Sequence, residues 1–173
     1  APEAEVRWSA EQAGVEGIAE LLGNSGPPEA RDAGSVILSS SGTTGGPRMA
    51  VRDWSSLVAN GNAAASGLAL RATDRLLVGV PLCHSYGVDL LCACLASGAC
   101  MILLERAAPR SIAAGLARGA TVWPTVPFQL EQAFHAGVSR HSLRTIVSAG
   151  SWLPGGLWQQ ARDRWGVTIG QLY

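Results

Sequence analysis

The sequence predicts an α/β protein with a layered, mostly parallel sheet flanked by helices. Short apolar runs of strand length alternate with helix-length segments from residue 35 onward. The 173 residues are enough for one domain, or one compact part of a larger domain, with a real core. Apolar residues make up 47% of the chain and charged residues 15%, below the roughly 25% of a typical soluble domain. We therefore expect a folded part of a protein whose surface packs, in part, against another domain or chain.

Residues 1–34 are expected to form an acidic N-terminal segment with one helix. Residues 9–12 resemble a capping box, and the apolar spacing after them favours a helix that ends near residues 23–24. Residues 1–32 hold seven acids and two arginines, a net charge of −5. Residues 33–173 hold six acids and eleven arginines, so this part carries +5 and suits a small anionic ligand.

From residue 35 the expected strands and helices follow one another closely. Strands are expected over residues 35–38 and 49–52, on either side of a Ser/Gly-rich loop, and Asp53 can cap a helix over 54–68. Further strands are expected over 76–80, 100–104, 121–123, 145–148 and 167–172. Further helices are expected over 86–96, 111–117, 126–135 and 154–165.

Composition excludes several classes of function. All 13 basic residues are arginine, so no step within this chain can use a lysine base or a Schiff base. The arginines are scattered, which argues against a nucleic-acid partner. The longest uncharged apolar run, residues 90–104, is shorter than the roughly 20 residues that span a bilayer, so we expect no membrane segment. Because the start is acidic and has no basic residues followed by an apolar core, we expect no secretion signal.

Four cysteines fall in one apolar stretch. They are Cys83, Cys92, Cys94 and Cys100. Their spacing lacks the paired Cys-x-x-Cys pattern of a zinc site, so buried reduced thiols are the favoured interpretation. Reduced thiols predict a cytoplasmic location.

Residues 39–48, Ser-Ser-Ser-Gly-Thr-Thr-Gly-Gly-Pro-Arg, are the most informative stretch. Small residues let successive backbone N–H groups converge on an anion, and Arg48 can place a two-pronged cation on phosphate oxygens. The pattern predicts a phosphate-binding loop, although it lacks the Gly-Lys-Ser/Thr of a Walker loop. A flexible linker is the alternative, since Gly and Ser mark loops of every kind.

Residues 40–48 resemble the phosphate-binding loop of the adenylate-forming, or AMP-binding, superfamily, which usually reads Thr-Ser-Gly-Ser/Thr-Thr-Gly-x-Pro-Lys-Gly. Three departures are Ser40 for threonine, Arg48 for lysine and Met49 for glycine. Later stretches resemble family segments in the family order. These are residues 80–87 (Pro-x-x-His-x-x-Gly of the CoA ligases), 126–127 (start of the helix beside the acyl pocket), 143–151 (strand and turn against adenine) and 169–173 (lead-in to Tyr-Gly-x-Thr-Glu).

The resemblance implies roles for individual residues. ATP would contact Ser41, Gly42, Thr43, Thr44, Gly45, Gly46 and Arg48 through its phosphates, and Ser148, Ala149, Gly150 and Tyr173 through adenine. Mg²⁺ would lie near Thr43 and Thr44, and His84 and Arg48 would be the catalytic residues. The acyl pocket would be lined by His84, Tyr86, Val88, Val126, Phe128 and Ser151. The alternatives are exposed loop hydroxyls, a structural histidine and an ordinary α/β core.

Other aromatic and histidine side chains are expected to be structural. His135 and His141 are expected at the surface. Trp123, Trp158 and Trp165 fall at core-facing spacings.

The implied protein is part of the large N-terminal domain of an acyl- or aryl-CoA ligase. Such an enzyme activates a carboxylic acid with ATP and transfers the acyl group to the thiol of coenzyme A or of a carrier-protein phosphopantetheine. His84 favours the CoA-ligase subclass, because amino-acid-activating domains usually carry an acidic residue in that stretch; the nearby Asp89 weakens the argument.

The resemblance also implies partners that lie beyond the chain. The sequence ends before the Gly-x-Thr-Glu motif and the C-terminal lid domain, so the rest of the enzyme is an expected partner and the isolated chain is expected to be inactive.

Two rival functions remain in view. The run Ser39–Ser41 could suggest a Ser-Ser-Lys amidohydrolase, but the chain has no lysine to act as its base. A non-catalytic nucleotide-binding or interaction module that retains the phosphate loop is the second rival.

Overall fold

The computed structural model describes residues 35–40, 48–138 and 141–172. The acidic segment 1–34 with its expected helix, the loop 41–47 and Tyr173 lie outside the described residues. The chain divides into two compact units, residues 1–54 and 55–173.

The first unit contains an antiparallel pair of strands, β1 (Ser35–Ser40) and β2 (Arg48–Asp53). The register runs from Ser35↔Asp53 to Ser40↔Arg48. Both expected strands are confirmed, and each is longer than the apolar run that predicted it. The pairing places the two ends of the Ser/Gly-rich loop opposite each other.

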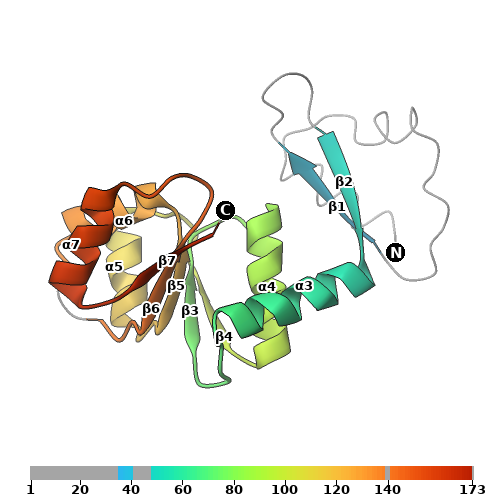
Figure 1. The fold of residues 1–173 in the computed structure, drawn as a ribbon, viewed down its shortest axis with the longest axis horizontal. Coiled ribbons are helices and arrows are strands. Elements are labelled where there is room, and N and C mark those ends of the chain that lie inside the picture. The colour runs from blue at the N-terminus through green and yellow to red at the C-terminus, as the bar shows by residue number, and fades with distance from the viewer. Residues whose placement is uncertain (1–34, 41–47, 139–140, 173) are drawn as a thin grey trace. The chain divides into compact units, whose positions relative to one another are not determined.

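The second unit is built on a parallel five-stranded sheet with the order β4-β3-β5-β6-β7 (Figure 1). This confirms the predicted architecture. The strands are β3 (Arg75–Val78), β4 (Cys100–Leu103), β5 (Val122–Thr125), β6 (Thr145–Ser148) and β7 (Ile169–Gln171).

Helices cover both faces of this sheet (Figure 1). They are α3 (Trp54–Gly67), α4 (Ser85–Ser97), α5 (Pro109–Ala117), α6 (Pro127–His135) and α7 (Gly155–Trp165). Leu77 faces a core formed with α5, α6 and α7, whereas its neighbours Leu76 and Val78 face a second core formed with α4. The inner strands β3, β5 and β6 therefore bury both faces, as their continuous apolar sequences predict, whereas the edge strand β4 leaves Cys100 and Leu103 exposed.

Asp74 joins the beginnings of three strands at the amino-terminal edge of the sheet. Its Oδ1 accepts hydrogen bonds from Thr121 Oγ1 (2.7 Å) and Arg144 Nε (3.0 Å), and its Oδ2 accepts from Arg71 N (2.9 Å) and Arg144 Nη2 (2.7 Å). Arg144 Nη2 also donates to Ala69 O (2.9 Å), beyond the end of α3. Only 4% of Asp74 is exposed, so the carboxylate replaces lost water with four donors.

Several side chains depart from the sequence expectations. Cys94 is buried and Cys92 half-buried, but Cys83 and Cys100 are exposed, so the expectation of four buried thiols was wrong. Cys100 opens the edge strand β4, and Cys83 lies in the turn before α4, where an apolar neighbourhood in sequence does not produce burial.

The predictions for the histidine and tryptophan side chains were confirmed in part. His135 is exposed as expected, but His141 is half-buried and was wrongly expected at the surface. Its ring lies edge-on to Trp165, and its Nδ1 accepts a hydrogen bond from Leu143 N (3.2 Å). Trp123 and Trp165 are confirmed in the core, and Trp158 is partly buried against it.

Candidate functional site

The sheet changes winding direction between β3 and β5. These strands are neighbours, but β3 leads to α4 on one face and β5 leads to α6 on the other. The two connections therefore diverge at the carboxyl ends of the strands, and the crevice expected at such a switch point is the place where open α/β sheets bind ligands.

The turn that follows β3 is held tightly to the start of α4. His84 N donates to Pro81 O (3.1 Å), and Val88 N donates to His84 O (3.0 Å). A side chain at Gly87 would overlap Pro81 O and lie 2.8 Å from Leu82 Cα, so only glycine lets the turn pack here. This is the physical reason for the Pro-x-x-His-x-x-Gly spacing in this chain.

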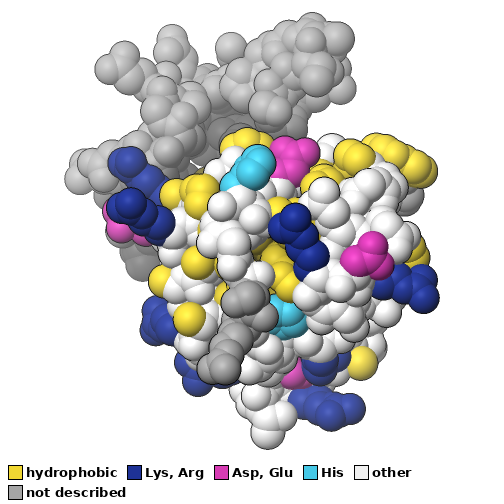
Figure 2. All heavy atoms as spheres, turned by 90° about the vertical axis from the view of Figure 1, so that its left-hand side faces the viewer, with side chains coloured by type: hydrophobic (Ala, Val, Ile, Leu, Met, Phe, Trp, Pro, Cys, Tyr) yellow, Lys and Arg dark blue, Asp and Glu magenta, His cyan; other side chains and the backbone are white. Residues whose placement is uncertain are grey.

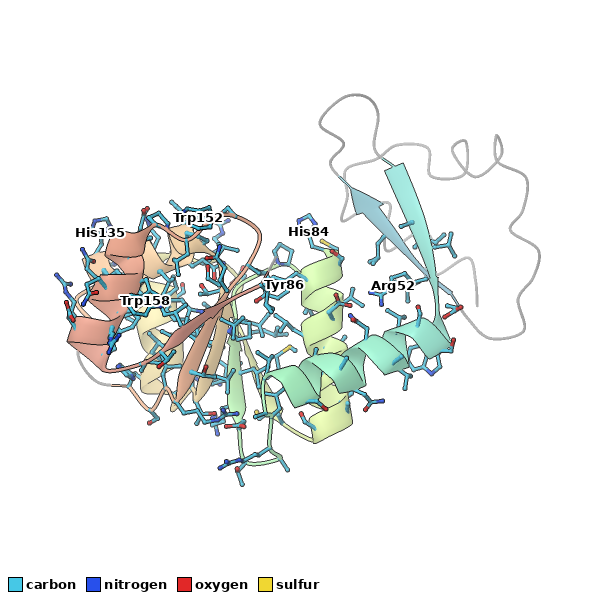
Figure 3. All side chains as sticks on the ribbon, viewed as in Figure 1. Arg52, His84, Tyr86, His135, Trp152 and Trp158 are labelled. Carbon is cyan, nitrogen blue, oxygen red and sulfur yellow. The ribbon has the colours of Figure 1, made fainter. Side chains whose placement is uncertain are left out.

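His84 and Tyr86 lie at the amino-terminal end of α4 (Figure 3). His84 is exposed. Tyr86 is half-buried against the α4 core, and its hydroxyl is buried with no hydrogen-bond partner among the described residues. Burial raises the pKa of Tyr86 well above its usual value, so the phenol stays protonated.

A cavity of about 530 Å³ opens at the carboxyl ends of the strands, between α4 and the turn after β6. It brings together four of the residues singled out from the sequence: Tyr86, Ala149, Gly150 and Ser151. Its remaining lining residues are Ser85, Asp89, Trp152 and Leu172. Gly150 has φ = +81°, a backbone conformation that favours glycine.

Other candidate residues do not line this cavity. Ser148 is fully buried, and its hydroxyl has no partner in the described part of the chain. Val88 and Val126 are half-buried, and Phe128 is 61% exposed at the start of α6. Val126 is nonetheless close, since its Cγ1 lies 3.6 Å from where a Cβ at Gly150 would be.

The phosphate-loop candidates Ser41, Gly42, Thr43, Thr44, Gly45 and Gly46, together with Tyr173, lie outside the described residues, as do the side chains of Ser40 and Arg48. Their expected contacts with ATP and Mg²⁺ stay predictions.

Sequence reasoning missed four cavity residues. Ser85 and Asp89 are separated by one helical turn. Had the helix been predicted to begin at Ser85, both residues would have been placed on the face that carries Tyr86. Trp152 follows the small-residue turn directly, yet 71% of it is exposed, which is unusual for so large an apolar side chain. Trp152 lies at the same end of the sheet as His84 (Figure 3).

Charged groups around the described site are sparse. Within residues 35–40, 48–138 and 141–172, no three His, Cys, Asp or Glu side chains are grouped as metal ligands would be. Figure 2 shows the arginines of the α5–α7 side of the molecule scattered rather than gathered. No described helix has the length and apolar character needed to cross a membrane.

The fold is that of an open parallel α/β protein, and its cavity lies at the carboxyl ends of the strands, where proteins of this class bind small ligands. The chain belongs to the AMP-binding enzyme family, whose model matches residues 2–173. No curated protein sequence matches it.

Solved structures share this fold. The N-terminal domain of FACL13 from Mycobacterium tuberculosis is 20% identical, with a TM-score of 0.74 over 86% of this chain. The o-succinylbenzoate CoA synthetase MenE from Bacillus subtilis is 24% identical, with a TM-score of 0.69 over 77% of this chain. The nonribosomal peptide synthetase FmoA3 is 27% identical, with a TM-score of 0.65 over 77% of this chain.

The chain spans 38%, 28% and 15% of the FACL13, MenE and FmoA3 chains, respectively. It therefore corresponds to part of the N-terminal domain of such proteins.

Proposed function

We propose that this chain is the phosphate-loop and acyl-pocket part of an acid–thiol ligase of the acyl- or aryl-CoA ligase type. The enzyme would activate a carboxylic acid with ATP as an acyl-adenylate and then transfer the acyl group to a thiol. One observation carries the proposal: a single cavity joins Tyr86 and Ser151, from the implied acyl pocket, to Ala149 and Gly150, from the implied adenine-binding turn. A MenE structure holds an acyl-adenylate, which makes this chemistry the natural one to test.

The chemistry of the first step fits the lining of the cavity. A carboxylate oxygen of the acid attacks the α-phosphorus of ATP in line, the bond to the β-phosphate oxygen breaks, and pyrophosphate leaves. The attacking carboxylate is already ionised, so no general base is needed and positioning dominates. The ionisable side chains that line the cavity are Tyr86 and Asp89.

In this proposal the loop holds the triphosphate. Backbone N–H groups from Gly42 to Gly46 and the hydroxyls of Ser41, Thr43 and Thr44 contact the β- and γ-phosphates, with Mg²⁺ near the two threonines. Arg48 adds a planar, permanently charged fork that helps pyrophosphate leave. The β1–β2 register supports this role, because it places Arg48 opposite Ser40 at the mouth of the loop. Another MenE structure contains ATP and a magnesium ion.

In this proposal the acid and the adenine contact two different sets of residues, of which Tyr86 and Ala149–Ser151 line the cavity. His84 lies beside the acyl carboxylate, with Tyr86, Val88, Val126, Phe128 and Ser151 around the acyl group. Ser148, Ala149 and Gly150 lie against adenine, and Tyr173 stacks on it. Half-burial of Tyr86, Val88 and Val126 suits an apolar acyl wall.

The acceptor thiol belongs to coenzyme A or to a carrier-protein phosphopantetheine. His84 favours the CoA-ligase type, and the match to MenE, a CoA synthetase, supports the same choice. A cytoplasmic location fits free thiols at the four cysteines. The partners are the remainder of the enzyme, with its C-terminal lid domain, and the small-molecule acid.

Acid-dependent exchange of pyrophosphate into ATP tests the proposal. The assay compares the 173-residue chain with the protein encoded by the complete reading frame that contains it, against a panel of carboxylic acids. We expect exchange from the complete protein and none from the chain alone. Arg48→Ala should lower the exchange rate by more than tenfold and Arg48→Lys by much less, whereas Arg118→Ala, an exposed arginine that ends α5, serves as the matched control.

Three results would contradict the proposal. Robust exchange by the isolated chain would overturn the assignment as an incomplete part. Exchange that survives Arg48→Ala unchanged would overturn the role of the loop. ATP binding by the complete protein without exchange for any acid would favour the non-catalytic module.

A further inference from the structure

Gln129 is a buried amide between the carboxyl ends of β3 and β5. It lies in the first turn of α6, and only 4% of it is exposed. Its Oε1 accepts a hydrogen bond from Thr125 Oγ1 (3.0 Å), at the end of β5. Its Nε2 donates to Gly79 O (2.9 Å), directly after β3. One side chain therefore ties together the two strands whose connections diverge.

The Gln129 amide binds the chain just beyond the point where the hydrogen bonds between β3 and its neighbouring strands end. The last sheet-like hydrogen bond on the β4 side runs from Leu104 N to Val78 O (2.9 Å). On the other side, β3 and β5 pair at Leu76↔Val122, well before their carboxyl ends. The next carbonyl along the chain, that of Gly79, is bound by Gln129 instead of by a strand.

The glycine at position 79 leaves room for this contact. A Cβ there would lie 3.1 Å from Gln129 Oε1 and 3.2 Å from Nε2, tighter than most real contacts. Gly79 does not adopt a positive φ, so backbone conformation is not what requires glycine. Close approach of the Gln129 amide is the remaining reason.

Gly79 is two residues before the turn that carries His84. The turn is closed by the bond from His84 N to Pro81 O, and α4 starts from it through the bond from Val88 N to His84 O. A displacement at Gly79 therefore moves the start of this turn, and with it His84, which directly precedes the cavity residue Ser85.

We propose that Gln129 is a positioning residue: it fixes the exit of β3 and thereby holds the Pro81–His84 turn, and His84 with it, at the crevice. The inference rests on the proposed function insofar as His84 is a site residue. Gln129 itself does not line the cavity, so it acts through the turn and not by contact with a ligand.

Native-state hydrogen exchange of the 173-residue chain tests the proposal, because it needs no substrate. The reporters are the amides of His84 and Val88, and the reference is the amide of Gly166, which donates to Arg162 O in α7. The variants are Gln129→Leu, which removes both hydrogen bonds, and Gln129→Glu, which keeps the shape. Thr121→Val is the matched control, since it removes a hydrogen bond to Asp74 at the opposite edge of the sheet.

In Gln129→Leu, we expect the amides of His84 and Val88 to exchange about tenfold faster relative to Gly166, because the turn opens locally. Thr121→Val should change the exchange rates of all three amides by a common factor. Gln129→Glu should behave like Gln129→Leu when its carboxylate is ionised. It should recover protection in mildly acidic solution, where the protonated carboxyl donates to Gly79 O and its other oxygen accepts from Thr125.

Uniform acceleration of the three amides in Gln129→Leu, or no recovery of Gln129→Glu in acid, would overturn the positioning role and leave the proposed function untouched. Conversely, failed pyrophosphate exchange by the complete, unsubstituted protein would overturn the proposed function without changing this result. In an active complete protein, Gln129→Leu should lower kcat for exchange with KM for ATP little changed.

Discussion

Replacing Asp74 by asparagine should destabilise the parallel-sheet unit although it changes neither size nor shape. Both carboxylate oxygens accept two hydrogen bonds each, from Thr121, Arg71 and Arg144. An asparagine amide group would point an N–H donor at two of these donors, whichever way it is flipped. The substitution also leaves the Arg144 guanidinium without its counter-charge.

The size of the effect follows from these contacts. At least one charge-assisted bond, about 1.5–3 kcal/mol, and one further bond, about 1 kcal/mol, are lost. The Arg144 side chain is 32% exposed and recovers part of this through water, so we expect a loss of about 3 kcal/mol in the free energy of unfolding. For a chain of this length that corresponds to a fall in Tm of about 6–12 °C.

The dependence on pH supplies a second readout. Hydrogen bonds from Arg144 hold the pKa of Asp74 well below its ordinary value of 3.8. A carboxyl with a lowered folded-state pKa contributes stability above its unfolded-state pKa and loses it as the pH falls further. The difference between the wild type and Asp74→Asn should therefore be largest near neutral pH and shrink below about pH 4.

Urea unfolding followed by the fluorescence of the buried Trp123 and Trp165 measures both effects. Asp163→Asn is the matched control, because this exposed carboxylate accepts a hydrogen bond from Gln159 Nε2 (2.8 Å) one helical turn away. The substitution should change the free energy of unfolding by less than about 0.5 kcal/mol. A difference below 1 kcal/mol at neutral pH, or one that does not vary with acid, would refute the reasoning.

Three further outcomes are expected from single positions. Gly87→Ala should lower the free energy of unfolding by roughly 2 kcal/mol or more, because the added methyl group overlaps the Pro81 carbonyl. Gly67→Ala is the control: its methyl group meets no atom within 4 Å, so the variant should be neutral or more stable by up to about 1 kcal/mol. Thermal melts of the two variants test this. Burial lowers the pKa of His141, so the fold should lose stability as the pH falls through about 6.5, and His141→Gln should flatten that slope in urea titrations. Tyr86→Phe should leave the Tm unchanged or raise it slightly, since the lost hydroxyl has no partner among the described residues; a clear fall in Tm would disprove this.

Much of the second unit could be predicted from local sequence. Each parallel strand is a short apolar run of the length that a sheet covered on both faces requires, such as Thr145–Ser148, whose bounds match the prediction. Helix ends were marked by glycine, as at Gly98 and Gly166, which both adopt the left-handed conformation. The predicted strand ends were less exact. A strand was expected over residues 167–172, but β7 covers Ile169–Gln171, because pairing with β6 and not hydrophobicity decides where a strand ends.

The site was less predictable because its residues are brought together by topology. Tyr86 and Ala149–Ser151 were singled out as separate motifs, but Trp152 and Leu172 carried no local signal that they would share a cavity with them. Nor could the sequence show that the amide of Gln129 would bind the carbonyl of Gly79, fifty residues away.

By itself, the amino-acid sequence determined the class of fold, the order of its elements and the motifs that mark an AMP-binding enzyme, because strand length, helix ends and glycine positions are local properties of a chain. Tertiary structure alone decided which strands became neighbours, that β3 and β5 send their connections to opposite faces, and which side chains line the cavity together. Those outcomes depend on pairing and packing between distant segments, whose energies no short stretch of sequence contains.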